Sequence, residues 1–134
     1  MIEKVSIITG ASGEIGQNLI SRFEKEKKKK VIALDLNPPN KKLHLYKFIQ
    51  GSILDIEIIN KLSENYIIEE IFHLAAVLST KAQENIELAQ QVNINGTLNL
   101  FNLALLQNLK HKITTKFFFP SSIAVYNTSI ENKA

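Results

Sequence analysis

Short apolar runs alternate along the chain with longer segments in which apolar residues recur at helical spacing. The runs are rich in β-branched and aromatic residues and end near Gly, Asp or Pro, which is typical of buried strands. We expect strands at residues 4–9, 31–34, 43–50, 71–76 and from 116 onward. The periodic segments between them predict helices from residue 14 to the lysine block near 27, from 55 to about 62, and from 83 to 109.

This order of elements indicates a fold class. Strands that are separated by helical segments are the sequence form of right-handed βαβ crossovers. We therefore predict an α/β fold, a doubly wound parallel sheet of about five strands with helices on both faces. Ligands of such sheets bind beyond the carboxyl ends of the strands. The residues that follow each strand are the first candidates for chemistry.

Two residues carry information about the predicted helices. Gly96 lies inside the longest helical segment, where glycine costs about 1 kcal/mol relative to alanine, so we expect a close packing contact there. Asp55 precedes another helical segment and is expected to cap it.

Composition narrows the class of protein. The 134 residues are 45% hydrophobic and 22% charged, which excludes a disordered or membrane-spanning chain. The sequence has no cysteine, and its three histidines fall at no metal-ligand spacing, so we expect neither disulfides nor a metal. The net charge is only +3, and the basic block at residues 25–30 suits a solvated helix end, so neither nucleic acid nor membrane is an expected partner. The sequence begins without a signal peptide, and we expect a cytoplasmic protein.

The segment GASGEIG, residues 10–16, follows the first predicted strand and opens a helix. Glycines at this spacing let the backbone turn tightly and approach a pyrophosphate, while the helix N-terminus offers N–H donors. Asp35 follows nineteen residues after Gly16, where a carboxylate accepts hydrogen bonds from the ribose of an adenosine and repels a 2′-phosphate. We expect a dinucleotide site that favours NAD over NADP. The alternatives are a turn without a ligand and an Asp35 that only prepares the turn at 37–39.

Further motifs follow in order: HLAA at 73–76, NINGTLNL at 93–100 and PSSIAVY at 120–126. Together with the glycine segment and Asp35, they resemble the extended short-chain dehydrogenase/reductases, the NAD-dependent epimerase/dehydratase family. Within it, the chain is most similar to the L-threonine 3-dehydrogenase branch, and UDP-sugar 4-epimerases and D-erythronate-type dehydrogenases share much of the pattern. The resemblance implies that residues 1–134 form an NAD-binding Rossmann domain, truncated before the substrate lobe of the longer family fold.

The resemblance also implies site residues. The implied cofactor-binding residues are Gly10, Gly13, Glu14, Ile15, Gly16, Asp35, Ser52, Ile53, Leu74, Ala75, Ala76, Asn93 and Ser121. The glycine segment would contact the pyrophosphate, and Asn93 would organise the nicotinamide end or, alternatively, merely face solvent. Gly51-Ser52 departs from the family's Gly-Asp, whose acid holds the adenine amine, so a weaker, charge-free contact is expected from Ser52. We expect His73 to be a packed strand-end residue rather than a base.

The resemblance implies a substrate side as well. Ser79 and Thr80 would contact substrate from a loop, and Ser122 would be the catalytic serine that hydrogen-bonds the substrate oxygen. The family's proton acceptor is a tyrosine in a YxxxK motif, and no such motif occurs in these residues. The fourth residue after each tyrosine is not lysine: Gln50 after Tyr46, Glu70 after Tyr66 and Ile130 after Tyr126.

The expected function is therefore that of the NAD-binding portion of an oxidoreductase that transfers hydride at a secondary alcohol, similar to L-threonine 3-dehydrogenase. A UDP-sugar 4-epimerase-like enzyme is one alternative. A non-catalytic dinucleotide-binding module is another, and the missing YxxxK favours it. The expected partners are a small-molecule secondary alcohol and either a second copy of the chain or a partner chain that completes the fold.

Overall fold

The computed structural model describes residues 1–27, 29–40 and 42–126. Five strands form one sheet in the order β3-β2-β1-β4-β5, and every neighbouring pair is parallel. This confirms the predicted α/β fold with a doubly wound, Rossmann-like sheet. The strands are β1 (Glu3–Thr9), β2 (Val31–Asp35), β3 (Lys47–Gln50), β4 (Tyr66–His73) and β5 (Lys116–Phe118).

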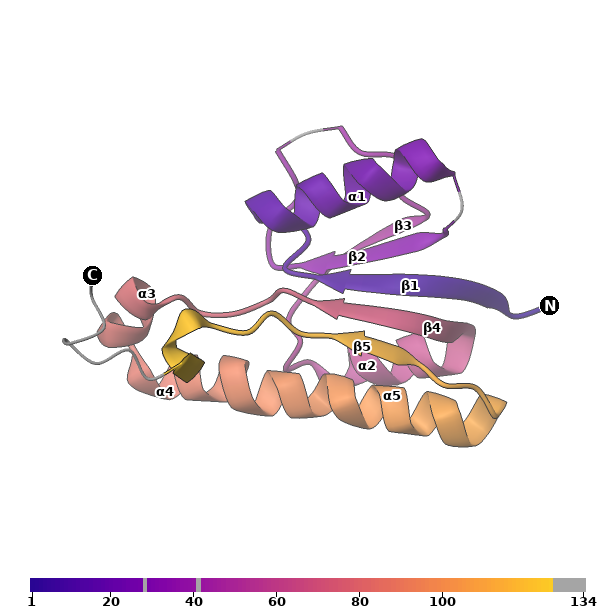
Figure 1. Cartoon of the computed structure of the whole chain (residues 1–134). Coiled ribbons are helices and arrows are strands. Elements are labelled where there is room, and N and C mark those ends of the chain that lie inside the picture. Colours follow the sequence, from indigo (N-terminus) through magenta and orange to yellow (C-terminus); the bar gives the residue numbers. More distant parts are fainter. Residues whose placement is uncertain (28, 41, 127–134) are drawn as a thin grey trace.

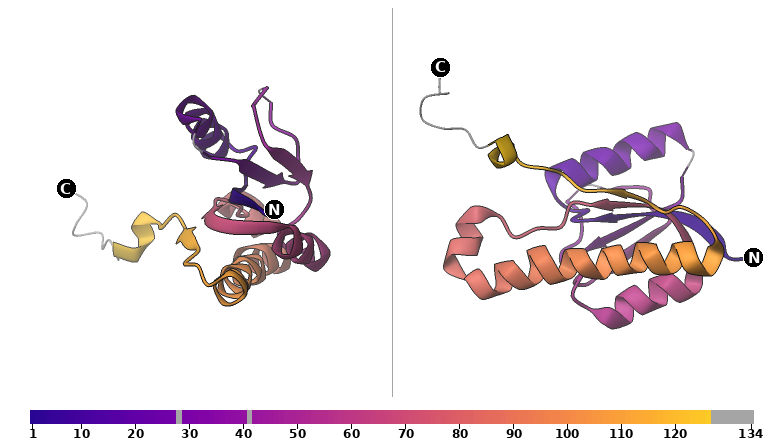
Figure 2. Two further views of the ribbon diagram at one scale, coloured as in Figure 1. Left: turned by 90° about the vertical axis from the view of Figure 1, so that its right-hand side faces the viewer. Right: turned by 60° about the horizontal axis from the view of Figure 1, so that its bottom comes forward.

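Helices cover both faces of the sheet (Figure 1). Helix α1 (Glu14–Glu26) lies on one face, and helices α2 (Ile56–Asn65) and α5 (Thr97–His111) lie on the other, as the second view of Figure 2 also shows. Successive side chains of a strand point to opposite faces. Ile7 therefore packs in the core beneath α2 and α5, while Ile8 packs against α1 with Ile20 and Phe23. Both faces of β1 and β2 are buried, which explains their continuous apolar runs.

The predicted helix over residues 83–109 is wrong as a single element. The structure has α3 (Ser79–Glu84), α4 (Ile86–Gln90), a π-helical segment η1 (Gln91–Gly96) and then α5. The break falls at Asn85, whose φ of −147° is not helical and whose side chain caps α4 by accepting from the Leu88 N–H at 3.0 Å. Ser79 and Thr80 lie in the first turn of α3 rather than in the predicted loop.

Two local predictions are confirmed. A Cβ at Gly96 would lie 2.4 Å from Ile53 Cδ1, so the glycine is required by the contact between η1 and the residues after β3. Asp55 caps α2, because its Oδ1 accepts from the backbone N–H groups of Glu57 and Ile58 at 2.9 and 3.3 Å. The third strand is shorter than predicted, since only Lys47–Gln50 pairs with β2.

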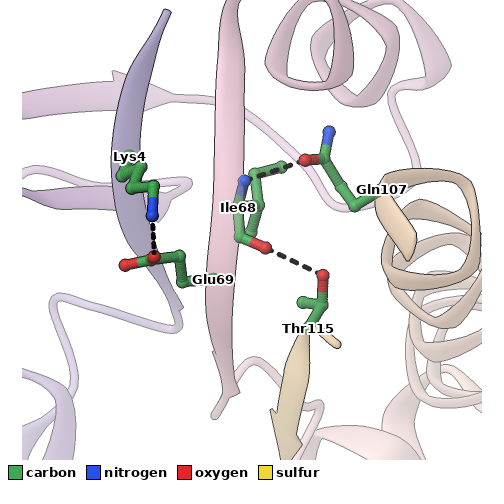
Figure 3. A network of polar contacts seen from close by, with 5 residues as sticks. All are labelled: Lys4, Ile68, Glu69, Gln107 and Thr115. Atoms are coloured by element: carbon green, nitrogen blue, oxygen red, sulfur yellow. Dashed lines mark hydrogen bonds and ion pairs between the residues drawn. The ribbon is translucent and has the colours of Figure 1, made fainter. Parts of the chain in front are cut away.

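The beginning of β4 is held by side chains rather than by a neighbouring strand on its outer side. Strand β5 pairs with β4 only from Glu70 onward. The Ile68 N–H therefore donates to Gln107 Oε1, and the Ile68 carbonyl accepts from the Thr115 hydroxyl, both at 2.8 Å (Figure 3). The Gln107 amide also donates to the Tyr66 carbonyl at 3.3 Å, which satisfies a fully buried polar side chain.

We expect Gln107→Leu to lower the free energy of unfolding by about 1–3 kcal/mol, because it leaves the buried Ile68 N–H without an acceptor. Urea unfolding of the two proteins measures the difference. The matched change at exposed Gln83, Gln83→Leu, is expected to alter stability by no more than about 0.5 kcal/mol. Equal stability of Gln107→Leu and the unaltered chain would contradict this role.

Candidate functional site

The turn between β1 and α1 depends on two glycines. Gly10 has a φ of +63°, a left-handed conformation that favours glycine. A Cβ there would lie 2.7 Å from Ala75 N and from Leu74 C, so the turn packs directly against the backbone that leaves β4. A Cβ at Gly16 would lie 2.5 Å from Gly10 O and 2.7 Å from Ala11 O. The first turn of α1 therefore lies directly on the loop.

The N-terminus of α1 is open to a ligand. Gly13 is the N-cap, and within the described part of the chain no side chain caps this helix end. The Gly13 N–H donates to the Gly10 carbonyl at 3.1 Å, and the Gln17 N–H donates to Gly13 at 2.9 Å. The backbone N–H groups of residues 14–16 belong to the first turn, where a helix supplies no acceptor of its own. These donors and the positive end of the helix dipole suit an anion such as a phosphate.

Asp35 ends β2 beside this loop. Its Oδ2 accepts from the Ser12 N–H at 3.0 Å, and its Oδ1 accepts from the Asn37 N–H at 3.0 Å. The Ser12 hydroxyl in turn donates to the Asn37 carbonyl at 2.5 Å. Asp35 thus stabilises the turn that follows it, which is the simpler of the two interpretations. Its bond to Ser12 also fixes its position next to the glycine loop. Each carboxylate oxygen can accept a further hydrogen bond.

A cavity of about 340 Å³ extends from this loop across the carboxyl ends of the strands. It brings together several residues that the sequence predicts to bind cofactor: Gly10, Asp35, Ser52, Ile53, Ala75 and Ala76. Its far wall is formed by Leu88 and Val92 from α4 and η1. This volume lies within the range of small-molecule sites.

A larger hollow of about 780 Å³ lies at the opposite ends of β1 and β4. All but one of the charged side chains in its described lining, Lys116 being the exception, form ion pairs: Lys29 with Glu70 at 2.5 Å, Lys30 with Glu3 at 2.5 Å, and Lys4 with Glu69 at 3.1 Å. The Lys29 ammonium and the Ser6 hydroxyl hydrogen-bond the Glu70 carboxylate and hold its pKa below the ordinary value, against the opposing effect of burial. These paired charges leave little excess charge for a ligand, so we assign the site to the smaller cavity.

His73 ends β4 and is fully buried. Its Nδ1 and Nε2 each lie 2.8 Å from a threonine hydroxyl, that of Thr9 and that of Thr97 respectively. The Thr97 hydroxyl donates its proton to the Asn93 carbonyl, so it accepts from the Nε2–H of His73. The Thr9 hydroxyl accepts from the Ala75 N–H and donates its own proton to Nδ1. Burial lowers the pKa of His73 to about 4. His73 is therefore a neutral packed residue, as the sequence predicts.

Asn93 lies in η1 and holds the segment that follows β4. Its Oδ1 accepts from the Val77 N–H at 2.8 Å, and its Nδ2 donates to the Val77 carbonyl at 3.1 Å. With His73 at the other end, the wall of the cavity between residues 73 and 77 is anchored twice. This contact excludes an Asn93 that merely faces solvent, while a contact with nicotinamide stays a prediction.

Other predicted residues lie outside the described lining of the cavity. Ser121 and Ser122 follow β5 and are exposed, and Ser122 opens a short 3₁₀ turn, η2 (Ile123–Tyr126), by accepting from the Val125 N–H at 3.2 Å. Ser79 and Thr80 are likewise exposed on α3, away from this lining. Their catalytic and substrate-binding roles stay predictions.

Sequence reasoning missed the residues that brace the loop. Ser12 and Asn37 bind Asp35, and the Gln17 side chain donates to the Ser12 carbonyl at 2.6 Å. Thr9 and Thr97 were missed as partners of His73. The available signal was Thr9 itself, a polar residue at the last position of its strand directly after the apolar Ile7 and Ile8.

The described residues contain no group of three or more His, Cys, Asp or Glu side chains that could hold a metal ion. No helix among them is both long and apolar enough to cross a bilayer.

The neutral state of His73 predicts a pH dependence. Its pKa is about 4 when folded and about 6.5 when exposed, so the unfolded chain binds more protons between these values. The contribution of the neutral His73 to the free energy of unfolding is fully present above about pH 6.5. It falls by about 2 kcal/mol between pH 7 and pH 5. In His73→Asn this part of the loss is absent, while His44→Asn at an exposed histidine retains it. Urea unfolding at both pH values measures it, and identical pH dependence in all three proteins would contradict the assignment.

Comparison with known proteins places this site in context. A model of the NAD dependent epimerase/dehydratase family matches residues 6–133. The chain is 34% identical over 122 residues to the inactive mitochondrial L-threonine 3-dehydrogenase of Homo sapiens, covering 90% of the chain and 50% of that relative. A monomeric L-threonine 3-dehydrogenase from a metagenome, solved in its apo form, is 39% identical with a TM-score of 0.75 over 90% of this chain and 37% of that one. The nucleoside-diphosphate-sugar epimerase from Agrobacterium tumefaciens is 27% identical with a TM-score of 0.77, over 92% of this chain and 39% of that one.

The chain therefore spans half or less of the length of these proteins. The family match nevertheless covers nearly all residues of this chain. It includes the glycine loop, Asp35, and His73 and Asn93, which anchor the cavity wall. Fold, loop geometry and sequence match agree, and this chain belongs to the NAD dependent epimerase/dehydratase family.

Proposed function

We propose that the chain binds NAD and forms the cofactor-binding domain, residues 1–134, of an oxidoreductase that removes hydride from a secondary alcohol, similar to L-threonine 3-dehydrogenase. The observation that carries this proposal is the fixed position of the Asp35 carboxylate beside an uncapped helix N-terminus. A dinucleotide needs both features at this spacing, one for a ribose and one for the pyrophosphate.

The residues of the loop fit such a group. The backbone at Gly10 and Gly16 leaves no room for side chains, and Gly13 faces outward with only Gly10 O within 3.3 Å of a Cβ. A phosphate can therefore approach the backbone N–H groups of the first turn of α1. The Asp35 carboxylate accepts from ribose hydroxyls and repels a 2′-phosphate, which favours NAD over NADP.

NAD, when bound, supplies the hydride acceptor. We propose that Ser122 hydrogen-bonds the oxygen of the substrate and that Ser79 and Thr80 contact the rest of a small secondary alcohol. None of the described tyrosines lines the cavity. Tyr126 is exposed in η2, and the fourth residue after it is isoleucine rather than lysine. Tyr46 and Tyr66 pack against each other, with ring centroids 6.2 Å apart, where β3 and β4 begin, at the pole opposite the glycine loop.

One further function is supported by a specific observation. The likeness to a nucleoside-diphosphate-sugar epimerase at a TM-score of 0.77 favours a sugar epimerase as the second candidate.

We also propose that a second copy or a partner chain covers apolar surface next to β5. Strand β5 is at the edge of the sheet, and Phe118 and Phe119 are exposed. Along α5 the exposed apolar side chains recur at helical spacing: Leu98, Phe101, Leu105 and Leu109. Unpaired edges and contiguous apolar surface favour association.

NAD at about 100 times its Kd is expected to stabilise the chain by about 2.7 kcal/mol, which raises Tm by several degrees. NADP is expected to give a smaller shift, because Asp35 faces its extra phosphate. In Gly13→Val the shift is expected to vanish without loss of the fold, since the N-cap backbone at φ −69° and ψ 167° accepts a β-branched residue. Thermal unfolding with each dinucleotide measures these effects.

The matched control is Asn60→Ala on the exposed surface of α2, which should keep the full shift. A shift with NADP equal to that with NAD would overturn the role of Asp35. NAD binding that survives in Gly13→Val would overturn the site itself.

We expect the isolated chain to oxidise L-threonine with NAD at least about 100-fold more slowly than a complete relative, because the chain lacks the family's general base. NADH absorbance measures the rate. Adding a polypeptide that carries YxxxK should restore activity, whereas the same polypeptide with its Tyr replaced by Phe should not. Turnover of about 1 s⁻¹ or more by the chain alone would show that it contains a base elsewhere.

A further inference from the structure

The cavity offers few polar groups to a nucleobase. The proposed function requires the pyrophosphate at the glycine loop and the ribose at Asp35. The purine of the dinucleotide then lies in the part of the cavity around Ser52. Among the side chains that line this cavity in the described chain, only those of Asp35 and Ser52 are polar. Its other side chains are aliphatic. Ser52 is therefore the side chain that meets the polar edge of the base.

The nearby backbone carbonyls already hold donors. The Ser52 carbonyl accepts from the Asp55 N–H at 3.0 Å, and the Ile53 carbonyl accepts from the Asn99 amide at 3.0 Å. On the neighbouring strand end, the Leu36 carbonyl accepts from the Gln50 amide at 3.0 Å. These bonds reduce the acceptors available for an exocyclic amine.

The Ser52 hydroxyl differs from these carbonyls in what it can offer. Its oxygen accepts from the Leu54 N–H at 3.1 Å, which fixes the position of the side chain. Among the described residues no other group binds this hydroxyl, so its own proton and a second lone pair are left for another partner. A hydroxyl rotates its proton to suit either a donor or an acceptor.

We propose that Ser52 makes the base site tolerant of the group at position 6 of a purine, so that a dinucleotide with hypoxanthine binds about as well as one with adenine. The 6-amino group of adenine donates to the Ser52 oxygen. The 6-oxo group of hypoxanthine accepts from the Ser52 proton. At position 6, a carboxylate can only accept, so it pairs with the amino group and not with the oxo group, whereas a neutral hydroxyl pairs with either.

The test compares NADH with reduced nicotinamide hypoxanthine dinucleotide by calorimetric titration of the unaltered chain. The two Kd values are expected to agree within about threefold. In Ser52→Asp, adenine is expected to be favoured by about tenfold or more, because the carboxylate repels the 6-oxo group. Thr114→Asp adds the same charge at an exposed position at the opposite pole, outside the cavity lining, and should leave the ratio unchanged.

The outcomes separate this inference from the proposed function. If the unaltered chain binds both dinucleotides but prefers adenine by about tenfold, the tolerance is refuted and NAD binding stands. If it binds neither, the proposed function fails and this inference fails with it. The ratio for the unaltered chain decides the matter even if Ser52→Asp does not fold, and circular dichroism reports whether that variant folds.

Discussion

The close approach of two backbone segments at Gly10 is the constraint on which the site depends. The turn after β1 lies directly against the backbone of Leu74 and Ala75, with no space for a single methyl group between them. This contact requires parallel neighbours, β1 and β4, that end at the same level, since Thr9 pairs with His73. The turn leads into α1, which packs back over one face of the sheet and begins next to the glycine loop. A side chain at Gly10 would therefore disturb the phosphate-binding loop and the cavity wall together.

The polar residues near this contact maintain it. Thr9 hydrogen-bonds both His73 and the Ala75 N–H, so the last residue of β1 fixes the exit of β4. Asn93 then holds Val77 from the π-helical segment. Such segments often occur at functional sites, because the widened turn redirects side chains. Family membership implies a dinucleotide cofactor, and we propose that the glycine loop and the cavity hold it. The residues proposed for the substrate lie outside the described lining of the cavity.

Much of the fold could be predicted from the sequence because buried parallel strands are continuous apolar runs. The glycine loop and Asp35 were predictable for a similar reason, since each is a local pattern. The start of β4 could not be predicted in this way, because Tyr66–His73 includes the charged residues Glu69 and Glu70. A bulge opposite Val5 and Ser6 accommodates them. Asn93 in the π-helical segment binds the distant Val77, which no local periodicity records. The break at Asn85 involves a local cap on Leu88, and the apolar spacing of the segment does not reveal it. The bracing of Asp35 by Ser12 likewise arises only in the folded chain.

The most direct test of the account is an NMR titration of the nitrogen-15-labelled chain with NADH, which reports on each backbone amide separately. If the helix N-terminus binds the pyrophosphate, the largest shifts at saturation should fall on the amides of residues 13–16, followed by those around Asp35. Small or no changes are expected near Lys29 and Glu70 at the opposite pole. The largest shifts at that pole, or no shift at residues 13–16 when binding is complete, would contradict the central claim that this loop is a dinucleotide site.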